Sequence, residues 1–276
     1  MSEVAVITGT THGIGRVTSR ALARAGRTVV MLCRNVASAG QVREDILREL
    51  PHARVGVVRC DLASLASVRA AAAAVRRDYP PLGLLINNAG IVSTRRRASP
   101  EGFELTFATN HLGPFLLTAL LTGHLVRGAR VVTVASQAHY GGRLDLDAVT
   151  DARAPYRAVA AYARSKLANV MHTFALARRL EGTGISVNCL HPGVVATHLL
   201  PAWLRIVKPL FTRVTFDAER GARTTNYLAL DEGVAGITGR YFDEEQRPCP
   251  AAALANDVAL QESLWSASAA WTQAPH

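Results

Sequence analysis

The sequence predicts an α/β fold in which a doubly wound parallel sheet carries helices on both faces. Short apolar runs rich in Val, Ile and Leu alternate along the chain with longer amphipathic segments of helical periodicity. The first apolar run leads into a glycine-rich turn, and a helical pattern follows that turn. The 276 residues are 49% hydrophobic, and no linker or change of composition divides them. We therefore expect residues 1–276 to form a single domain.

The apolar runs predict the strands, because a parallel sheet covered on both faces needs nearly continuous apolar strands. The expected strands span residues 4–7, 28–33, 54–59, 82–86, 130–136, 185–190 and 240–242. Helical patterns cover residues 16–26, 36–50, 64–79, a segment around 162–166 and 251–266. A further helix is predicted to start at Ser99 and to run past Asn110, because Ser99, Pro100 and Glu101 resemble an N-cap, a first-turn proline and a first-turn acid.

The charge of the chain comes almost wholly from arginine, and the only lysines are Lys166 and Lys208. The net charge is +10 and the isoelectric point is about 10.2. The arginines are spread along the chain without interleaved aromatic residues, so we expect no nucleic-acid partner. A basic surface that favours anionic ligands is the simpler interpretation.

The cysteines and the apolar runs indicate a cytoplasmic protein. Cys33, Cys60, Cys189 and Cys249 are scattered without metal-ligand spacing, so we expect free, mostly buried thiols and no metal site. No apolar run reaches the roughly 18–20 residues that a transmembrane helix needs, and the first residues do not have the pattern of a secretory leader.

The glycine-rich turn has the features of a phosphate-binding loop. It lies between a strand and a helix, so backbone N–H groups and the positive end of the helix dipole can approach an anion. Its spacing, Gly-x-x-x-Gly-x-Gly, differs from the common dinucleotide fingerprint, and an ordinary tight turn is the alternative. The predicted contacts in this loop are Gly9, Thr11, His12, Gly13, Ile14 and Gly15.

Arg34 and Asn35 end the second strand about twenty residues after this loop, where a site for NAD normally places an Asp or Glu. An arginine there can instead form charge-assisted hydrogen bonds with a 2′-phosphate, and His12 could add a donor. The sequence thus predicts NADP(H) as the cofactor, although Arg34 could also be an ordinary arginine at a strand end.

Two later strand ends are further candidates for cofactor contacts. Asp61 and Leu62 follow the third strand, and Asp61 either faces the ligand or caps the next helix. Asn88, Ala89 and Gly90 follow the fourth strand, where they allow close approach of a cofactor or merely form a turn.

Tyr162 and Lys166 lie four residues apart on a predicted helix and so share one face of it. A phenol has a pKa of about 10, and lowering it by three units needs roughly 4 kcal/mol of phenolate stabilisation, which a desolvated cation can supply. We therefore expect Lys166 to lower the pKa of Tyr162 and make it a proton shuttle. An ordinary surface pair is the alternative, but a lysine retained where arginine is otherwise used suggests a specific task.

Two polar residues are expected near this pair. Ser136 ends the fifth strand, at the same edge of the sheet as the other strand ends. Asn110 is surrounded by apolar residues and must be hydrogen-bonded, either as a structural bridge or within a proton relay.

Residues 194–215 have apolar side chains at helical spacing, among them Leu200, Trp203, Leu204 and Val207. This stripe favours a lid over an apolar substrate, with a membrane-surface helix or plain core as alternatives.

Taken together, the motifs closely resemble those of the short-chain dehydrogenase/reductases over nearly the whole chain. They comprise Thr-Gly-x-x-x-Gly-Ile-Gly at residues 8–15, Asn-Asn-Ala-Gly at 87–90, Asn110, Ser136, Tyr162 with Lys166, and Pro-Gly-x-x-x-Thr at 192–197. Further runs, such as His-Pro-Gly at 191–193 and Gly-Arg-Tyr-Phe at 239–242, are similar to the retinol dehydrogenase and WW-domain oxidoreductase branch.

The resemblance implies a Rossmann-type fold with a catalytic tetrad of Asn110, Ser136, Tyr162 and Lys166. Ser136 would orient a carbonyl, Tyr162 would give or take the proton, Lys166 would hold the nicotinamide ribose, and Asn110 would position a water. Tyr162 and Lys166 would thus also contact the cofactor, as would Pro192, Gly193, Val195 and Thr197.

The activity implied is NADP(H)-dependent interconversion of an alcohol with a ketone or aldehyde on a fairly apolar small molecule. A catalytically silent NADP-binding interaction protein is the alternative, because a fold does not fix a function. The resemblance also favours a homodimer or homotetramer. Arg34 followed by Asn35, rather than by the Asp usual in this branch, and Thr11 with His12 in the glycine loop depart from the family pattern.

Overall fold

The computed structural model describes residues 3–193 and 218–275, which share one seven-stranded parallel sheet. The strands follow the order β3-β2-β1-β4-β5-β6-β7 and every neighbouring pair is parallel. Their bounds are β1 Val4–Thr8, β2 Thr28–Cys33, β3 Val55–Arg59, β4 Leu82–Asn87, β5 Leu125–Val134, β6 Ser186–Leu190 and β7 Arg240–Phe242. The chain runs outward from β1 to β3 and then returns to β4 on the other side of β1. The predicted doubly wound sheet is confirmed, and its order reverses between β1 and β4, where such sheets bind ligands.

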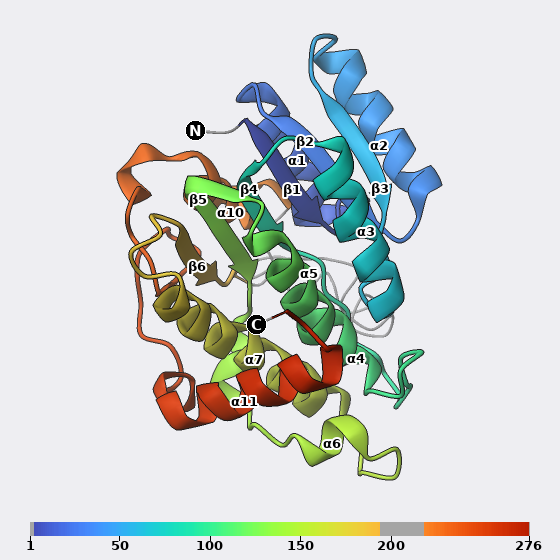
Figure 1. Ribbon diagram of the computed structural model, residues 1–276, viewed down its shortest axis with the longest axis vertical. Helices are drawn as coiled ribbons and strands as arrows, with labels where there is room; N and C mark the ends of the chain where they lie inside the picture. The colour runs from blue at the N-terminus through green and yellow to red at the C-terminus, as the bar shows by residue number, and fades with distance from the viewer. Residues whose placement is uncertain (1–2, 194–217, 276) are drawn as a thin grey trace, which may run out of the picture.

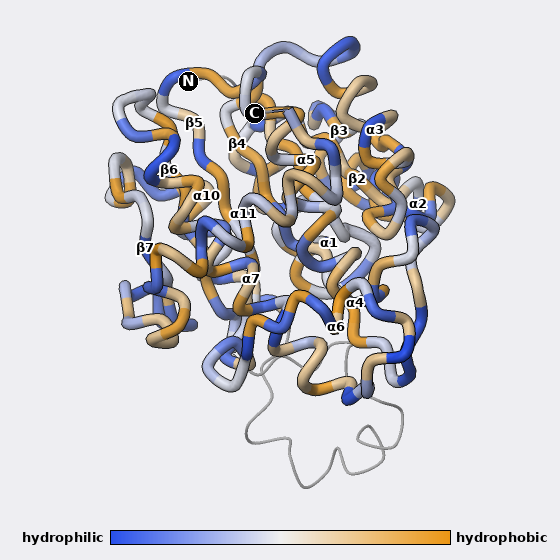
Figure 2. Tube along the Cα trace, turned by 60° about the horizontal axis from the view of Figure 1, so that its bottom comes forward, coloured by the Kyte–Doolittle hydropathy of each residue, from blue (hydrophilic) through white to orange (hydrophobic). Residues whose placement is uncertain are grey.

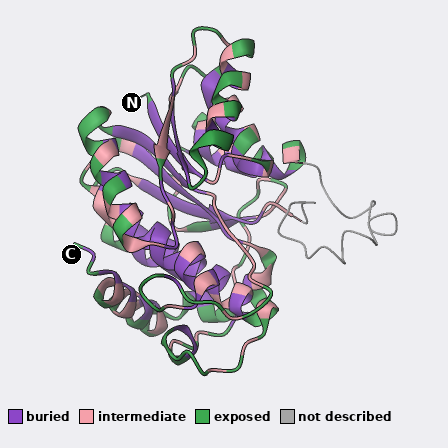
Figure 3. Cartoon of the chain, turned by 90° about the vertical axis from the view of Figure 1, so that its right-hand side faces the viewer, coloured by how far each residue is buried: buried purple, intermediate pink, exposed green. Residues whose placement is uncertain are grey.

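Helices cover both faces of the sheet (Figure 1). One face packs against α1 Gly13–Arg24, α2 Val36–Glu49 and α10 Ala218–Leu230. The other packs against α3 Leu65–Asp78, α5 Gly113–Thr122 and α7 Ala158–Arg179, and α11 Val258–Thr272 lies across α5 and α7. The strands are accordingly buried between two helical layers in Figure 3, and hydrophilic residues gather on outer helices and loops in Figure 2.

Shorter elements lie in the connections. They are α4 Leu105–Phe107, a π-helical turn Ala108–Leu112, α6 Asp147–Thr150, and 3₁₀ turns at Gln137–Gly141, Glu232–Val234 and Ala253–Asn256. The sequence predicted one helix over the region of α4 and the π-helical turn, and it did not predict α6, the 3₁₀ turns or α10. No helix in the described part of the chain is both long and apolar enough to cross a membrane. The predicted lid, residues 194–215, lies outside the described residues.

The helix expected to begin at Ser99 begins six residues later. Gly102 adopts a left-handed conformation with φ of +90°, and Ser99 N–H bonds to the carbonyl of Phe103 at 2.7 Å, which closes a turn instead of a helix. The buried Glu104 is the N-cap, because its carboxylate accepts the amide hydrogens of Thr106 and Phe107 at 2.8 and 2.9 Å. Ser99 resembled a cap because its hydroxyl accepts the amide hydrogen of Glu101 at 3.2 Å within that turn.

The closing helix also starts later than predicted, at Val258 instead of residue 251. Asp257 caps it by accepting the amide hydrogen of Leu260 at 3.0 Å, and a 3₁₀ turn precedes it. The four cysteines are free thiols, as predicted, with three of them buried and Cys249 partly exposed.

Candidate active site

The glycine loop is folded tightly onto the end of β4. Gly9 and Gly13 have positive φ values of +72° and +58°, which side chains rarely adopt. A Cβ on Gly15 would lie 2.2 Å from the Gly9 carbonyl oxygen and 2.5 Å from Nδ2 of Asn88. A Cβ on Gly9 would lie 2.8 Å from Cα of Ala89. Each of these positions therefore needs glycine, and the loop brings the N-terminus of α1 to the point where the strand order reverses.

Thr8 and Asn88 join the ends of β1 and β4. The Thr8 hydroxyl accepts the amide hydrogens of Asn88 and Ala89, both at 3.0 Å. The Asn88 side-chain amide donates to the carbonyls of Thr8 and Gly9 at 2.8 and 3.1 Å. Asn88 thus holds the glycine loop against the sheet, and Ala89 and Gly90 continue the same partly buried wall.

Arg34 lies exposed at the end of β2, and its guanidinium has no ion-pair partner among the described residues. Asn35 is the N-cap of α2, since its Oδ1 accepts the amide hydrogen of Ser38 at 3.1 Å. His12 is exposed as well, with Nδ1 lying 2.9 Å from the Thr11 hydroxyl. Arg34 is therefore available to an anionic ligand, whereas Asn35 has a structural task.

Of the two alternatives for Asp61, helix capping is wrong. Ser64 caps α3 by accepting the amide hydrogen of Ser67 at 3.3 Å. Asp61 accepts the amide hydrogen of Ala63 at 3.0 Å, which forms a turn at the end of β3. Leu62 is buried beside α5. There a Cβ on Gly113 would lie 2.3 Å from the Leu62 carbonyl oxygen.

Ser136, Tyr162 and Lys166 come together at the carboxyl end of β5. Ser136 follows that strand, and its hydroxyl accepts the amide hydrogen of Ala138 at 3.2 Å and is hydrogen-bonded to the Tyr162 hydroxyl. Tyr162 and Lys166 come from adjacent turns of α7. The Lys166 ammonium lies 5.7 Å from the centre of the Tyr162 ring and donates to the carbonyl of Val134 at 2.8 Å.

The protonation equilibria of this pair differ from the expectation. Burial raises the pKa of Tyr162, and the hydrogen bond with Ser136 opposes this only in part. Burial also lowers the pKa of Lys166 to about 8. The prediction that Lys166 lowers the pKa of Tyr162 is therefore wrong for this structure, because burial sets the direction of the shift, Ser136 is the group that opposes it, and the Lys166 ammonium is directed at a backbone carbonyl.

Asn110 bridges two segments within the π-helical turn. Its Oδ1 accepts the amide hydrogen of Ile91 at 2.8 Å, and its Nδ2 donates to the Ile91 carbonyl at 2.9 Å and to the Ser165 hydroxyl at 3.0 Å. Of the two readings of Asn110, the structure shows the structural bridge. Asn110 lies close to Lys166, since both side chains face Gly90. A Cβ added to Gly90 would lie 3.4 Å from Lys166 Nζ and 3.6 Å from Asn110 Oδ1.

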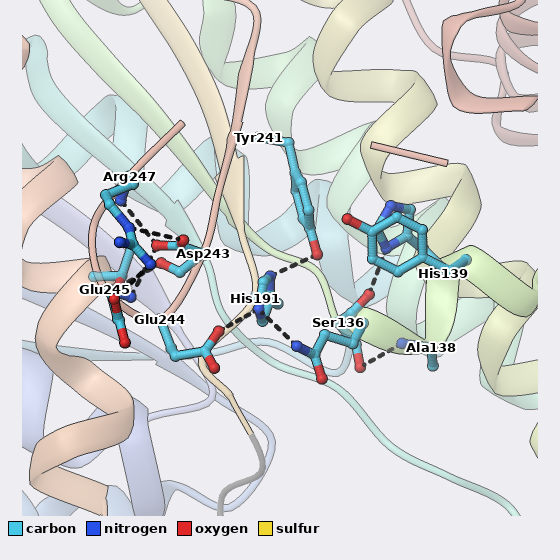
Figure 4. Close-up of polar contacts among 12 residues, drawn as sticks. Ser136, Ala138, His139, His191, Tyr241, Asp243, Glu244, Glu245 and Arg247 are labelled. Atoms are coloured by element: carbon cyan, nitrogen blue, oxygen red, sulfur yellow. Dashed lines mark hydrogen bonds and ion pairs between the residues drawn. The ribbon is translucent and has the colours of Figure 1, made fainter. Parts of the chain in front are cut away.

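A histidine network next to Ser136 was not anticipated from the sequence (Figure 4). His191 is buried at the end of β6. Its Nδ1 lies 2.7 Å from the Tyr241 hydroxyl, and its Nε2 contacts the Glu244 carboxylate and the side-chain amide of Gln137, the latter at 3.0 Å. The available signal was a titratable residue directly after a buried strand. Pro192 and Gly193 follow it, and Val195 and Thr197 lie outside the described residues.

His139 holds the backbone of Ser136 from the other side. Its Nε2 accepts the amide hydrogen of Ala252 at 3.1 Å, so its ring hydrogen is on Nδ1 and is donated to the Ser136 carbonyl at 2.8 Å. The strand end that carries Ser136 is therefore fixed by contacts on both sides.

Comparison with known proteins agrees with this geometry. Residues 3–205 match the family model for short chain dehydrogenases. The chain is 40% identical to human retinol dehydrogenase 14, over 96% of this chain and 85% of that protein. It is 42% identical to dehydrogenase/reductase SDR family member 13 of Bos taurus, over 96% of this chain and 72% of that protein.

Solved structures give the same result. An uncharacterised protein from Mycobacterium paratuberculosis superposes with a TM-score of 0.82 at 33% identity, covering 99% of this chain and 95% of that one. A short chain dehydrogenase from Burkholderia cenocepacia in complex with NADP superposes with a TM-score of 0.71 at 26% identity, covering 88% and 96%. Together with the glycine loop and the cluster around Tyr162, these similarities show that the chain belongs to the short-chain dehydrogenase/reductase family of oxidoreductases.

Proposed function

We propose that this protein is an NADP(H)-dependent oxidoreductase that interconverts an alcohol with a ketone or aldehyde on a fairly apolar small molecule. The observation that carries the proposal is the meeting of Ser136, Tyr162 and Lys166 at the carboxyl end of β5, on the ligand-binding edge of the sheet. Hydroxyl, phenol and ammonium groups are the donors that a carbonyl oxygen needs as it gains a proton.

The residues present fit a nicotinamide cofactor. The glycine loop has no room for side chains at Gly9 and Gly15, so a diphosphate can approach its backbone and the N-terminus of α1. The exposed Arg34, which has no ion-pair partner in the part of the chain that the structure describes, supports the phosphorylated form, because its guanidinium can pair with a 2′-phosphate. The bound cofactor would supply or accept the hydride.

The chain's own residues would handle the substrate oxygen and its proton. The Ser136 hydroxyl orients the carbonyl, and Tyr162 donates the proton in the direction of reduction. The phenol of Tyr162 is protonated at neutral pH and so can act as the donor, and burial, which raises its pKa, makes this proton harder to release. Lys166 supplies positive charge beside the Tyr162 ring, and Asn110 holds the neighbouring segment of residues 90–91 in place.

The experiment is a test of NADPH oxidation against a panel of aldehydes and ketones, with Tyr162→Phe alongside the wild type. The variant loses one oxygen, so it should bind NADPH with unchanged affinity while turnover falls by at least about 100-fold. Lys166→Arg keeps the charge but not the shape, and should lose most activity as well.

The catalytically silent alternative makes a different forecast. A redox-silent member of the family would bind NADPH tightly yet oxidise none of it with any carbonyl in the panel. Equal rates for the wild type and Tyr162→Phe would remove Tyr162 from the mechanism.

A further inference from the structure

His191 is the centre of a buried junction between three strand ends. It belongs to the end of β6, its Nδ1 contacts the hydroxyl of Tyr241 from β7, and its Nε2 contacts Gln137, which follows Ser136 at the end of β5 (Figure 4). The His191 side chain is only 5% exposed, so its two nitrogens must find protein partners. The third partner of His191 is Glu244, whose side chain is 30% exposed.

The neighbours of His191 orient its ring. Burial raises the pKa of Tyr241, which therefore stays a protonated phenol that can donate its hydrogen to Nδ1. The ring hydrogen is then on Nε2, where the Glu244 carboxylate accepts it. Nε2 also lies 3.0 Å from the Gln137 side-chain amide. An Nε2–H group can be shared with this amide only through the amide oxygen, so the hydrogen-bond network orients the Gln137 amide with its oxygen toward the ring.

Gln137 connects this junction to the reacting groups. It is the residue directly after Ser136, and the same turn is closed by the Ala138 amide hydrogen, which the Ser136 hydroxyl accepts at 3.2 Å. The Ser136 carbonyl is already held by His139. The contact between Gln137 and His191 is a second attachment of the same turn. It also ties the Ser136 hydroxyl to the strand end that continues into Pro192 and Gly193.

We propose that His191 is a positioning residue that acts through Gln137 to set the place of the Ser136 hydroxyl relative to the end of β6. Glu244 and Tyr241 fix the ring so that its Nε2 side faces Gln137. The inference rests on the proposed function in assigning the catalytic benefit to Ser136. The mechanical link between His191 and the turn does not depend on it.

Two substitutions of His191 distinguish the role of Nε2 from the role of Nδ1. In His191→Gln the side-chain amide can reach the position of Nε2 and keep the contacts with Gln137 and Glu244. In His191→Asn the shorter side chain reaches only the position of Nδ1 and keeps the contact with Tyr241. A merely structural histidine would be affected similarly by both, whereas positioning through Nε2 requires that Gln restores what Asn loses. The control is Glu245→Gln, a neighbouring exposed carboxylate that pairs with Arg247.

The first readout is hydrogen exchange of the peptide covering residues 135–142, which needs no turnover. We expect faster exchange there in His191→Asn, and wild-type exchange in His191→Gln and Glu245→Gln. Unchanged exchange in His191→Asn would overturn the proposal, whatever its activity. If His191→Asn does not fold, Gln137→Ala replaces it, because that side chain is exposed and its removal breaks the same link.

The second readout is the split between kcat and KM. A displacement of about 1 Å at a reacting group can reduce the rate on the order of 100-fold, so kcat should fall tenfold or more in His191→Asn, with NADPH affinity and KM nearly unchanged. His191→Gln should recover most of kcat, and an equal loss in both variants would contradict the proposal. A wild type that is inactive with every carbonyl would refute the proposed function, and the exchange experiment would still decide the role of His191.

Discussion

The Lys166 ammonium donates a hydrogen bond of 2.8 Å to the carbonyl oxygen of Val134, the last residue of β5. This contact ties α7 to the sheet just before Ser136. It compensates the buried charge only in part, because burial still lowers the pKa of Lys166 to about 8 from its usual 10.5. A lysine is thus retained in a place where it costs stability, which is typical of functional sites.

Lys166→Met should therefore stabilise the protein at neutral pH. The folded state binds the proton of Lys166 less tightly than the unfolded state does, so wild-type stability rises as the pH increases from about 8 to 10.5. At pH 7, burying the charged Lys166 amine costs about 3 kcal/mol of folding free energy. The variant avoids this cost but loses the hydrogen bond to Val134, which stabilises the wild type by about 1 kcal/mol. Thermal unfolding should show a gain of about 2 kcal/mol at pH 7 that disappears by pH 10.5. A gain that does not depend on pH would contradict this assignment.

Arg34→Ala should change the choice of cofactor. Removing a charged partner of a phosphate typically costs about 1.5–3 kcal/mol, so NADPH should bind about 10–150-fold more weakly, while NADH binding stays nearly constant. Titration of both cofactors by fluorescence measures this. Arg76→Ala, which removes an exposed arginine of α3, is the matched control and should leave both affinities unchanged. Equal losses for NADPH and NADH would exclude Arg34 as the 2′-phosphate ligand.

His172→Phe should make the protein less sensitive to acid. His172 is buried against Phe115 and Trp265, with ring centres 5.1 and 5.5 Å apart, and burial lowers its pKa to about 3. Because the unfolded state binds its proton near pH 6.5, the stability that neutral His172 contributes is present above that pH and is lost as the pH falls toward 3.

At pH 4.5 the loss attributable to His172 is about 2–3 kcal/mol. Between pH 7 and pH 4.5, the melting temperature of the variant should therefore fall by less than that of the wild type. His111, whose pKa is lowered to about 4 by burial, keeps some acid sensitivity in both proteins. The exposed His52 gives a control substitution, His52→Gln, that should follow the wild type.

Gly15→Ala should destroy the glycine loop. The new Cβ would lie 2.2 Å from the Gly9 carbonyl oxygen, which is a backbone atom that cannot move without shifting the end of β1. We expect loss of cofactor binding together with a lower melting temperature. The matched control is Gly40→Ala in α2, where a Cβ meets nothing within 4 Å, and this helical substitution should stabilise by up to about 1 kcal/mol. Wild-type NADPH affinity in Gly15→Ala would refute the role given to the loop.

The sequence predicted the sheet well because strands that are buried on both faces consist of uninterrupted apolar runs. It failed at Ser99, where the hydroxyl really does cap a turn, but the left-handed Gly102 prevents that turn from growing into a helix. Helix starts were recognisable where the capping side chain directly precedes the periodic segment, as with Ser64.

The candidate site shows the same division. The residues of the cluster could be named because they follow strands or share a helix face, as Tyr162 and Lys166 do. The direction of the pKa shift of Tyr162 could not be predicted, because it depends on how deeply the phenol is buried and on where the Lys166 ammonium points. The junction at His191 depends on contacts between residues about 50 positions apart, which no local pattern reveals.

The near absence of lysine makes amine chemistry an unusually selective probe of this molecule. Lys166 is one of two lysines in the chain, and burial lowers the pKa of its amine to about 8 but leaves the residue only 3% exposed, so a reagent reaches it when the surrounding cluster opens. Acylating reagents would therefore modify very few positions, and one of them reports on the cluster itself. The extent of labelling of the peptide that carries Lys166, read by mass spectrometry, would measure occupancy of the site without any knowledge of the substrate.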